Sequence, residues 1–434
     1  MRGVGFSPSA SEEHPLLKAS HGILLIYLAV IYAGCLQFFI TFSSALLYGT
    51  YLVIVGCLTI SLFINWHVIR QLKSIVIYLI WIFAYLLWAS LASADNVVFF
   101  EGVRLFIKNV LLISALAIAL TYNTIRRFSG FVQLAVVGNC CLSVWEAFDP
   151  ELVRAIALTR QEDATAFNVL RPAGLWSNPD EAAFAIIFAL LLSRWASPRL
   201  AALGRIAGLT ALILTASRTG TYLTVFCMLI LAAERLRSLR PAYQLLILAS
   251  ILPAIAAILL TVQGLSVPDI NEHGQISRIF DINESTRDPD AASRLEIAIT
   301  AVTTALDHPW YGSGLFTFQC EGTFPAVLDV PSHNVYLTVW GEAGPVVFAT
   351  YLFILAYGLF KSYLTLSPSR DCTTLMLMWI CYLIIGITWH NQFTSFSGML
   401  YISLLLHLHT VIHPFKNLYF AIGDQRNNAN SFEQ

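Results

Sequence analysis

The chain has 434 residues, of which 57% are hydrophobic and only 12% are charged, and its formal net charge is −1. A soluble protein of this length would carry about 25% charged residues, whereas here apolar runs near the ~20 residues that a membrane helix needs recur along most of the chain. This composition excludes a water-soluble globular protein, and no basic tract suggests nucleic-acid binding. The sequence therefore predicts an all-α polytopic membrane protein.

The N-terminal residues are polar and carry both signs of charge, without the basic start and apolar stretch of a signal peptide, so we expect a retained tail. Hydropathy then predicts a series of membrane segments. In chain order they lie at about 22–40, 44–64, 74–92, 99–121, 128–146, 178–193, 243–262, 345–361, 372–388 and 394–413.

The apolar stretch from Arg205 to Glu234 has Arg218 at its centre, and it is either one long helix or two short helices joined at "SRTG". An arginine in the middle of a bilayer costs roughly 2.5 kcal/mol or more. Arginines also flank the stretch on both sides, which places both flanks in the cytoplasm. We therefore predict a hairpin, in which Gly220 relaxes the backbone of the turn and Arg218 lines a wet or anionic cavity near the outer side. The flanking arginines are Arg194, Arg199, Arg205, Arg235, Arg237 and Arg240.

With this hairpin counted as two helices, the sequence predicts about 12 transmembrane helices in a single integral membrane domain over residues 1–434. Both tails, 1–20 and 414–434, are expected in the cytoplasm. Two long periplasmic loops are expected at 147–177 and 263–333, and the second, partly helical loop lies between helices 9 and 10.

The loop at 263–333 is predicted to contain an amphipathic helix. Asp288 is a favourable N-cap, and Pro289 suits the first helical position. We expect the helix to end before Pro309, with "WYGSG" turning the chain, and Arg294 to point inward beside the apolar face. That face comprises Leu295, Ile299, Val302 and Leu306.

Several polar residues are predicted to gather on the outer side. They are Arg171 in "LRPAGLWSNPDE", Arg218 in "SRTG", Arg294 in "SRLE" and His333 in "PSHNVYLTVWGEAG". Each has a structural alternative: an arginine at a helix end can reach the headgroups, Arg218 can form a buried ion pair, and His333 can be an ordinary residue of a helix N-terminus. Together they indicate another function, because arginines bind pyrophosphate and a neutral histidine is the usual general base for a hydroxyl.

Two further sets of charged residues have two interpretations each. Glu101, Arg104 and Lys108 share a helix face, where they form an internal salt bridge or bind an anionic lipid headgroup. Glu342 either caps or pairs near the outer end of its helix or contributes to substrate binding.

Four motifs resemble, in order and spacing, the O-antigen ligase/polymerase family, and among its members the lipid A-core:surface polymer ligases most closely. The resemblance covers residues 168–350 and implies that Arg218, Arg294 and His333 are essential, with Arg171 at a motif position. The motifs are "RPAGLWSNPDEAAF", "LTASRTGTYL", "SRLEIAITAVTTALDHPWYGSGLFTF" and "SHNVYLTVWGEAG".

The implied enzyme is a glycosyltransferase of the bacterial inner membrane with a periplasmic active site. It would transfer a glycan from undecaprenyl diphosphate to a sugar hydroxyl of lipid A-core, completing lipopolysaccharide, with inversion of the anomeric centre. His333 would deprotonate the acceptor, and Arg218 and Arg294 would stabilise the leaving diphosphate, so neither a metal nor another cofactor is expected.

Substrate binding is expected at Arg171, Arg104, Lys108 and Glu342, and the expected partners are the donor, the acceptor and membrane lipids. An O-antigen polymerase or a protein O-oligosaccharyltransferase of the same family is an alternative. A lipid-linked glycan transporter or flippase is an alternative from another class, although it would need polar groups along the whole crossing.

Overall fold

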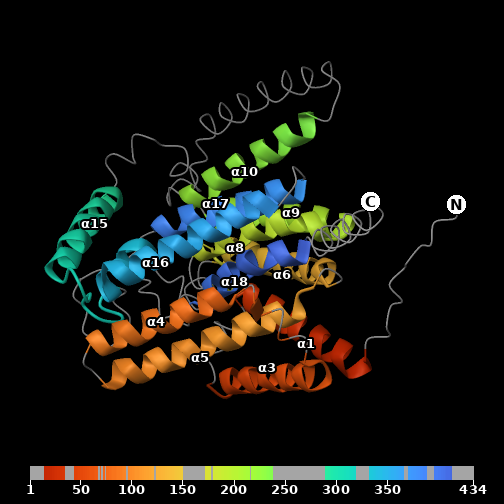
Figure 1. Cartoon of the computed structure of the whole chain (residues 1–434). Coiled ribbons are helices and arrows are strands. Elements are labelled where there is room, and N and C mark those ends of the chain that lie inside the picture. The colour runs from red at the N-terminus through yellow and green to blue at the C-terminus, as the bar shows by residue number, and fades with distance from the viewer. Residues whose placement is uncertain are drawn as a thin grey trace, which may run out of the picture.

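The computed structural model folds the described part of the chain into helices without a strand (Figure 1). It describes residues 14–34, 44–66, 69, 72–73, 75–93, 96–121, 124–149, 172–176, 179–215, 217–237, 289–318, 332–365, 370–388 and 395–412. The helices are α1 (Pro15–Tyr32), α3 (Ser44–Ile64), α4 (Val76–Ala92), α5 (Asn96–Ala119), α6 (Ile125–Phe148), α8 (Pro179–Leu192), the short 3-10 helix η2 (Ser193–Trp195), α9 (Pro198–Thr215), α10 (Arg218–Arg237), α15 (Pro289–Asp307), α16 (Val335–Thr365), α17 (Arg370–Thr388) and α18 (Phe396–Ile412).

These helices have the composition of a multi-pass membrane protein. Six of them, α1, α5, α6, α9, α16 and α17, are long and apolar enough to cross a membrane, and parts of α3, α4 and α18 form shorter apolar helices. Each predicted apolar segment overlaps a described helix except 243–262, which lies outside the described residues together with the tail at 414–434 and most of the two long loops. Of the tail predicted at 1–20, residues 1–13 also lie outside them, whereas α1 already begins at Pro15. The all-α membrane class is therefore confirmed, and the count of 12 helices stays a prediction.

The stretch around Arg218 is two helices, as the flanking arginines indicated. α9 ends at Thr215 and α10 begins at Arg218. Both helices pack on α8, where Gly220 of α10 lies against Ala183. The chain is thus interrupted beside Arg218, as the hairpin prediction required.

α8 forms the buried centre of the bundle. Its residues from Glu181 to Ala189 are all buried, so this helix has no face left for lipid. α6 and α9 approach each other closely beside it, because Gly204 of α9 leaves room for Gln133 of α6. Gln133 in turn donates a hydrogen bond of 2.8 Å to the carbonyl of Ala189, which ties α6 to α8.

Polar side chains join three elements at one end of the bundle. Arg194 Nε, at the end of α8, lies 3.0 Å from Asp371 Oδ1 at the start of α17. Arg205 Nε of α9 donates to Ser193 Oγ at 2.9 Å. These arginines belong to the flank that the sequence places in the cytoplasm.

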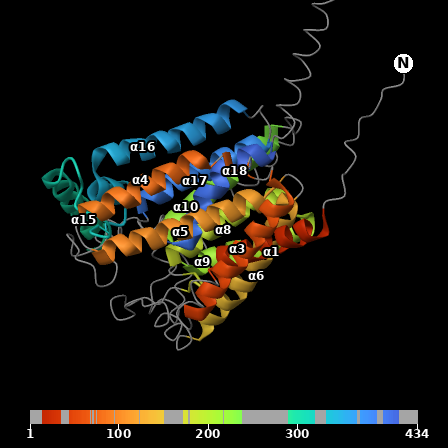
Figure 2. The ribbon, with the colours of Figure 1, turned by 60° about the horizontal axis from the view of Figure 1, so that its bottom comes forward.

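α15 covers the opposite end, where α4 ends and α16 begins (Figure 1, Figure 2). α15 belongs to the loop that the sequence places in the periplasm. The predicted inner and outer loops thus lie at opposite ends of the bundle, and which end faces the periplasm stays a prediction.

Introduced cysteines test this orientation, because an impermeant maleimide labels only thiols outside the membrane of intact cells. We expect His308→Cys, after α15, to be labelled from outside, and Arg199→Cys, at the start of α9, to be labelled only after permeabilisation. Both positions are exposed, and the unsubstituted chain gives the background. Labelling of Arg199→Cys in intact cells would contradict the topology.

Candidate active site

A break in α16 organises the α15 end. Gly344 has a non-helical backbone (φ 77°, ψ 177°), and Pro345 follows it. Proline has no N–H, so the carbonyl of Gly341 has no helical donor at this position. The sequence predicted a membrane segment only from residue 345, whereas α16 starts at Val335. The hydropathy signal missed its first turns because they include Thr338 and Glu342.

The loop after α15 supplies the missing donors. The Ser313 N–H donates to the carbonyl of Gly341 at 2.7 Å, and the Gly314 N–H donates to the carbonyl of Glu342 at 3.1 Å. On its other side, the Leu315 N–H donates to the carbonyl of Ala89 in α4 at 2.9 Å. The predicted turn at "WYGSG" is therefore present, and it joins α4 to α16.

Two glycines make this close approach possible. Gly312 and Gly314 have positive φ angles of 74° and 105°, a region that glycine adopts freely. A Cβ on Gly312 would lie 2.4 Å from the carbonyl of Glu342, and a Cβ on Gly314 would lie 2.4 Å from Ser93 Oγ. Any larger residue would push the loop away from the helices.

His333 has an unusual backbone conformation directly before α16. Its φ is 48°, in the left-handed region that residues other than glycine rarely adopt. The preceding residue is fixed, because the Ser332 N–H donates to the carbonyl of Phe318 at 3.1 Å and Ser332 Oγ lies 2.8 Å from Thr338 Oγ1. Such strain costs of order 1–3 kcal/mol and concentrates at functional sites.

The following residue, Asn334, is the N-cap of α16. Its Oδ1 accepts hydrogen bonds from the N–H groups of Tyr336 at 3.0 Å and Leu337 at 3.2 Å. Both neighbours of His333 are therefore used to hold the backbone, and the half-buried imidazole lies between two fixed residues.

α15 is the helix predicted in the main loop, but its buried face differs from the prediction. Ala301 and Ala305 are buried against Phe318 and the first turns of α16, whereas Ile299 and Leu306 are each 57% exposed. Hydropathy favours the larger residues, but the close contact with α16 requires small ones. The predicted N-cap Asp288 lies outside the described residues.

Arg294 lies on the buried face of α15 by register. It precedes Ala301 by seven residues, close to two helical turns, so the two share a face. Its side chain lies outside the description. The inward orientation of Arg294 stays a prediction.

Arg218 is the first residue of α10, and its side chain also lies outside the description. The predicted reason for Gly220 is wrong, because this glycine lies inside α10 and does not have a positive φ angle. It is needed because a Cβ there would lie only 2.5 Å from Ala183 Cβ of α8. The close contact fixes the start of α10 against the start of α8.

α17 links the middle of α10 to the start of α16. Cys227 Sγ of α10 lies 3.4 Å from Cys381 Sγ of α17. Further toward the α15 end, the Tyr336 hydroxyl of α16 donates to the carbonyl of Leu383 at 2.7 Å. α10, which starts at Arg218, and α16, which follows His333, thus pack on the same helix, and α15 packs on α16.

The segment after Arg171 is held by two polar side chains that the sequence analysis did not single out. Glu146 Oε2 accepts hydrogen bonds of 2.9 Å from the N–H groups of both Ala173 and Gly174. Asn139 Oδ1 accepts from the Leu175 N–H at 2.7 Å. The signal was present, because a carboxylate and an amide inside an apolar helix need polar partners. Arg171 itself lies outside the described residues.

Glu342 is paired near the outer end of its helix, which was the structural alternative for this residue. It is fully buried, and its carboxylate accepts hydrogen bonds from the Tyr85 hydroxyl at 2.5 Å and the Phe318 N–H at 3.3 Å. The carboxylate thereby connects α4, α16 and the loop. Direct substrate binding by Glu342 stays a prediction.

The predicted salt bridge on α5 is present. Arg104 Nη2 lies 2.8 Å from Glu101 Oε2, and the Arg104 side chain is 67% exposed. Lys108, one turn further along, is half-buried. Binding of an anionic headgroup by these residues stays a prediction.

The family comparison covers most of this site. Residues 203–352 match the family model described as O-Antigen ligase. This segment belongs to the O-antigen ligase family. The O-antigen ligase segment contains Arg218, Arg294, His333 and Glu342, whereas Arg171 lies before it. No curated protein matches the chain. Members of this family are glycosyltransferase-like enzymes, and the match supports an enzymatic role of that general kind.

The hydrogen bond from Tyr85 to Glu342 predicts that a substitution at Tyr85 lowers the stability of the protein. Tyr85→Phe removes a donor from a buried carboxylate and should lower the free energy of unfolding by about 1–3 kcal/mol. Thermal unfolding of the purified protein in detergent measures this. Tyr78→Phe is the matched control, since the Tyr78 hydroxyl is buried on the same helix without a hydrogen-bond partner among the described residues. Equal shifts for the two variants would argue against a structural role for the Tyr85–Glu342 contact.

Proposed function

We propose that the protein is an O-antigen ligase, which transfers a glycan from undecaprenyl diphosphate to lipid A-core and so completes lipopolysaccharide. It would act in the bacterial inner membrane with the α15 end facing the periplasm. The observation that carries the proposal is the left-handed backbone of His333, held by Ser332 and Asn334 within the O-antigen ligase segment. A strained and fixed histidine is typical of a catalytic residue.

In the proposed reaction His333 accepts the proton of an acceptor sugar hydroxyl. The hydroxyl oxygen attacks the anomeric carbon of the donor glycan on the face opposite the diphosphate. The new glycosidic C–O bond forms as the bond from the anomeric carbon to the diphosphate oxygen breaks, so the anomeric centre is inverted. The electron pair of the broken bond stays on the diphosphate.

The guanidinium groups of Arg218 and Arg294 are proposed to stabilise the charge that develops on the diphosphate. Arg171 is proposed to bind the same group, and Arg104 and Lys108 the headgroup region nearby. Because the carboxylate of Glu342 is fully buried, it would act through the loop that it holds rather than by direct contact with a substrate.

In vitro transfer tests both the acceptor and the metal-independent mechanism. We expect the purified protein to transfer glycan from undecaprenyl diphosphate to lipid A-core at an unchanged rate after exhaustive chelation, since arginines supply the positive charge. Transfer to a second lipid-linked glycan instead would identify a polymerase, and transfer to a protein would identify a protein O-oligosaccharyltransferase. Loss of activity with EDTA and recovery with Mg²⁺ or Mn²⁺ would refute the arginine mechanism.

The roles of Arg218 and His333 are separable by conservative variants. Arg218→Lys keeps the charge but loses the planar fork, and loss of such a donor typically lowers the rate by about 10²–10³. His333→Ala removes the proposed base, worth roughly 10²–10⁴, and should leave donor affinity nearly unchanged because the base acts on the acceptor. Donor affinity and transfer rate are measured on variants with wild-type thermal stability, so that misfolding is excluded. Wild-type transfer by His333→Ala would eliminate its role as base.

A further inference from the structure

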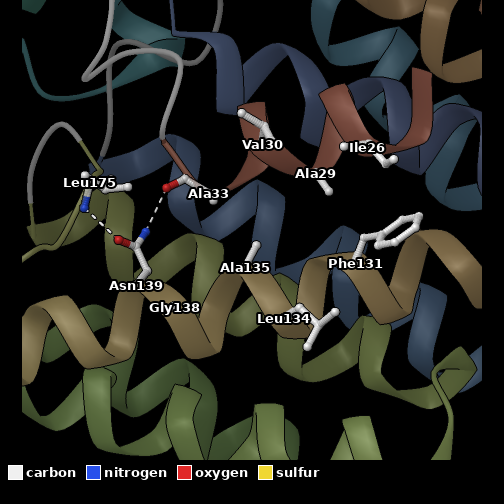
Figure 3. Close-up of a pocket in the computed structure, with 10 residues that line it drawn as sticks. All are labelled: Ile26, Ala29, Val30, Ala33, Phe131, Leu134, Ala135, Gly138, Asn139 and Leu175. Carbon is white, nitrogen blue, oxygen red and sulfur yellow. Dashed lines mark hydrogen bonds between the residues drawn. The ribbon is translucent and has the colours of Figure 1, made fainter. Parts of the chain in front are cut away.

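An apolar groove runs between α1 and α6 (Figure 3). Its volume is about 360 Å³. Small residues form it, because Ala29 of α1 and Ala33, which follows α1, face Ala135 and Gly138 of α6 and leave a hollow between the helices. The remaining lining residues are Ile26, Val30, Phe131, Leu134, Asn139 and Leu175.

The groove opens to the surface of two helices that are long and apolar enough to cross a membrane. Ile26 is 48% exposed, Val30 39% and Leu134 49%, so the rims of the groove are also apolar. Inside a bilayer this surface meets hydrocarbon, and the occupant that fits it is a hydrocarbon chain.

One end of the groove is polar and leads toward the proposed active site. There Asn139 donates to the carbonyl of Ala33 and accepts from the N–H of Leu175, both at 2.7 Å (Figure 3). Leu175 lies four residues after Arg171. Arg171, a proposed diphosphate-binding residue, is thus only four residues along the chain from the groove.

The same end is one helix away from Arg218. α8 begins at Pro179, four residues after Leu175. Four residues further on, Ala183 packs against Gly220, which follows Arg218 by two residues. A chain lying in the groove would thus have its polar end near the starts of α8 and α10.

We propose that this groove binds a segment of the polyprenyl chain of the donor lipid, which rests on the proposed function. The donor fits better than the acceptor for two reasons. Leu175 of the groove lies four residues after Arg171, and arginine suits the diphosphate that terminates the polyprenyl chain. A single groove also suits the one polyprenyl chain of the donor, whereas a lipid A anchor carries several acyl chains.

Gly138→Leu fills the groove from within. A Cβ at Gly138 meets nothing within 4 Å, so the substitution occupies the hollow without displacing a packed side chain. Gly56→Leu on α3 is the matched control, because a Cβ at Gly56 also meets nothing within 4 Å and Gly56 is not part of the groove.

Transfer is measured with a donor bearing the undecaprenyl chain and one bearing a two-unit isoprenoid chain, with lipid A-core as acceptor. We expect Gly138→Leu to raise the KM for the undecaprenyl donor about tenfold, the size of effect that a blocked apolar contact gives. The kcat should stay near wild type, as should the KM values for the short donor and for the acceptor, and Gly56→Leu should match wild type throughout.

A rise in the acceptor KM alone would assign the groove to acyl chains of the acceptor and overturn the proposal. If Gly138→Leu and Gly56→Leu gave the same values in every measurement, the groove would contact only bulk lipid, and the proposal would again be overturned. Direct binding of glycan-free undecaprenyl diphosphate to purified protein distinguishes this result from failure of the proposed function. If Gly138→Leu bound undecaprenyl diphosphate more weakly than the wild type, but the wild type transferred glycan from no donor, the groove would still be a polyprenyl site and the proposed ligase activity would be rejected.

Discussion

The break at Gly344 and Pro345 is the constraint on which the α15 end depends. A helix interrupted there leaves carbonyls without helical donors, and an unsatisfied backbone group near a membrane costs several kcal/mol. The N–H groups of Ser313 and Gly314 provide the missing hydrogen bonds. The loop is therefore attached to α16 by backbone bonds, and α15, which precedes it, is held across the end of the bundle. Non-helical backbone is tolerated here because protein surrounds it.

This attachment explains how His333 keeps a conformation that it would not adopt alone. The loop reaches Phe318, whose carbonyl accepts from Ser332, and Asn334 caps the next helix. These contacts must together outweigh the order of 1–3 kcal/mol that a left-handed residue costs. The first turns of α16, which precede the predicted membrane segment, thus form a short platform between the break and the histidine.

The sequence predicted the helices and the division of the Arg218 stretch, because apolar periodicity and flanking charge report directly on membrane helices. It did not predict which face of α15 is buried. Ile299 and Leu306 are more hydrophobic than Ala301, but the distance between helices favours the smaller residue, and that distance is a tertiary property. The reason for Gly220 was missed in the same way, since its neighbour Ala183 is distant in sequence. Pairing of Glu342 near its helix end was anticipated, whereas its partner Tyr85 on α4 required the fold.

In both irregular segments that adjoin proposed active-site residues, a buried carboxylate accepts hydrogen bonds from backbone N–H groups. Glu146 binds the N–H groups just after Arg171, and Glu342 binds the N–H of Phe318 in the loop that leads from α15. Each carboxylate lies on a helix and is buried, so the hydrogen bonds are sheltered from water and comparatively strong. A site that stabilises a diphosphate by electrostatics needs dipoles and charges that are already in place before the reaction. By holding backbone next to proposed active-site residues, the two buried carboxylates would provide part of this preorganisation.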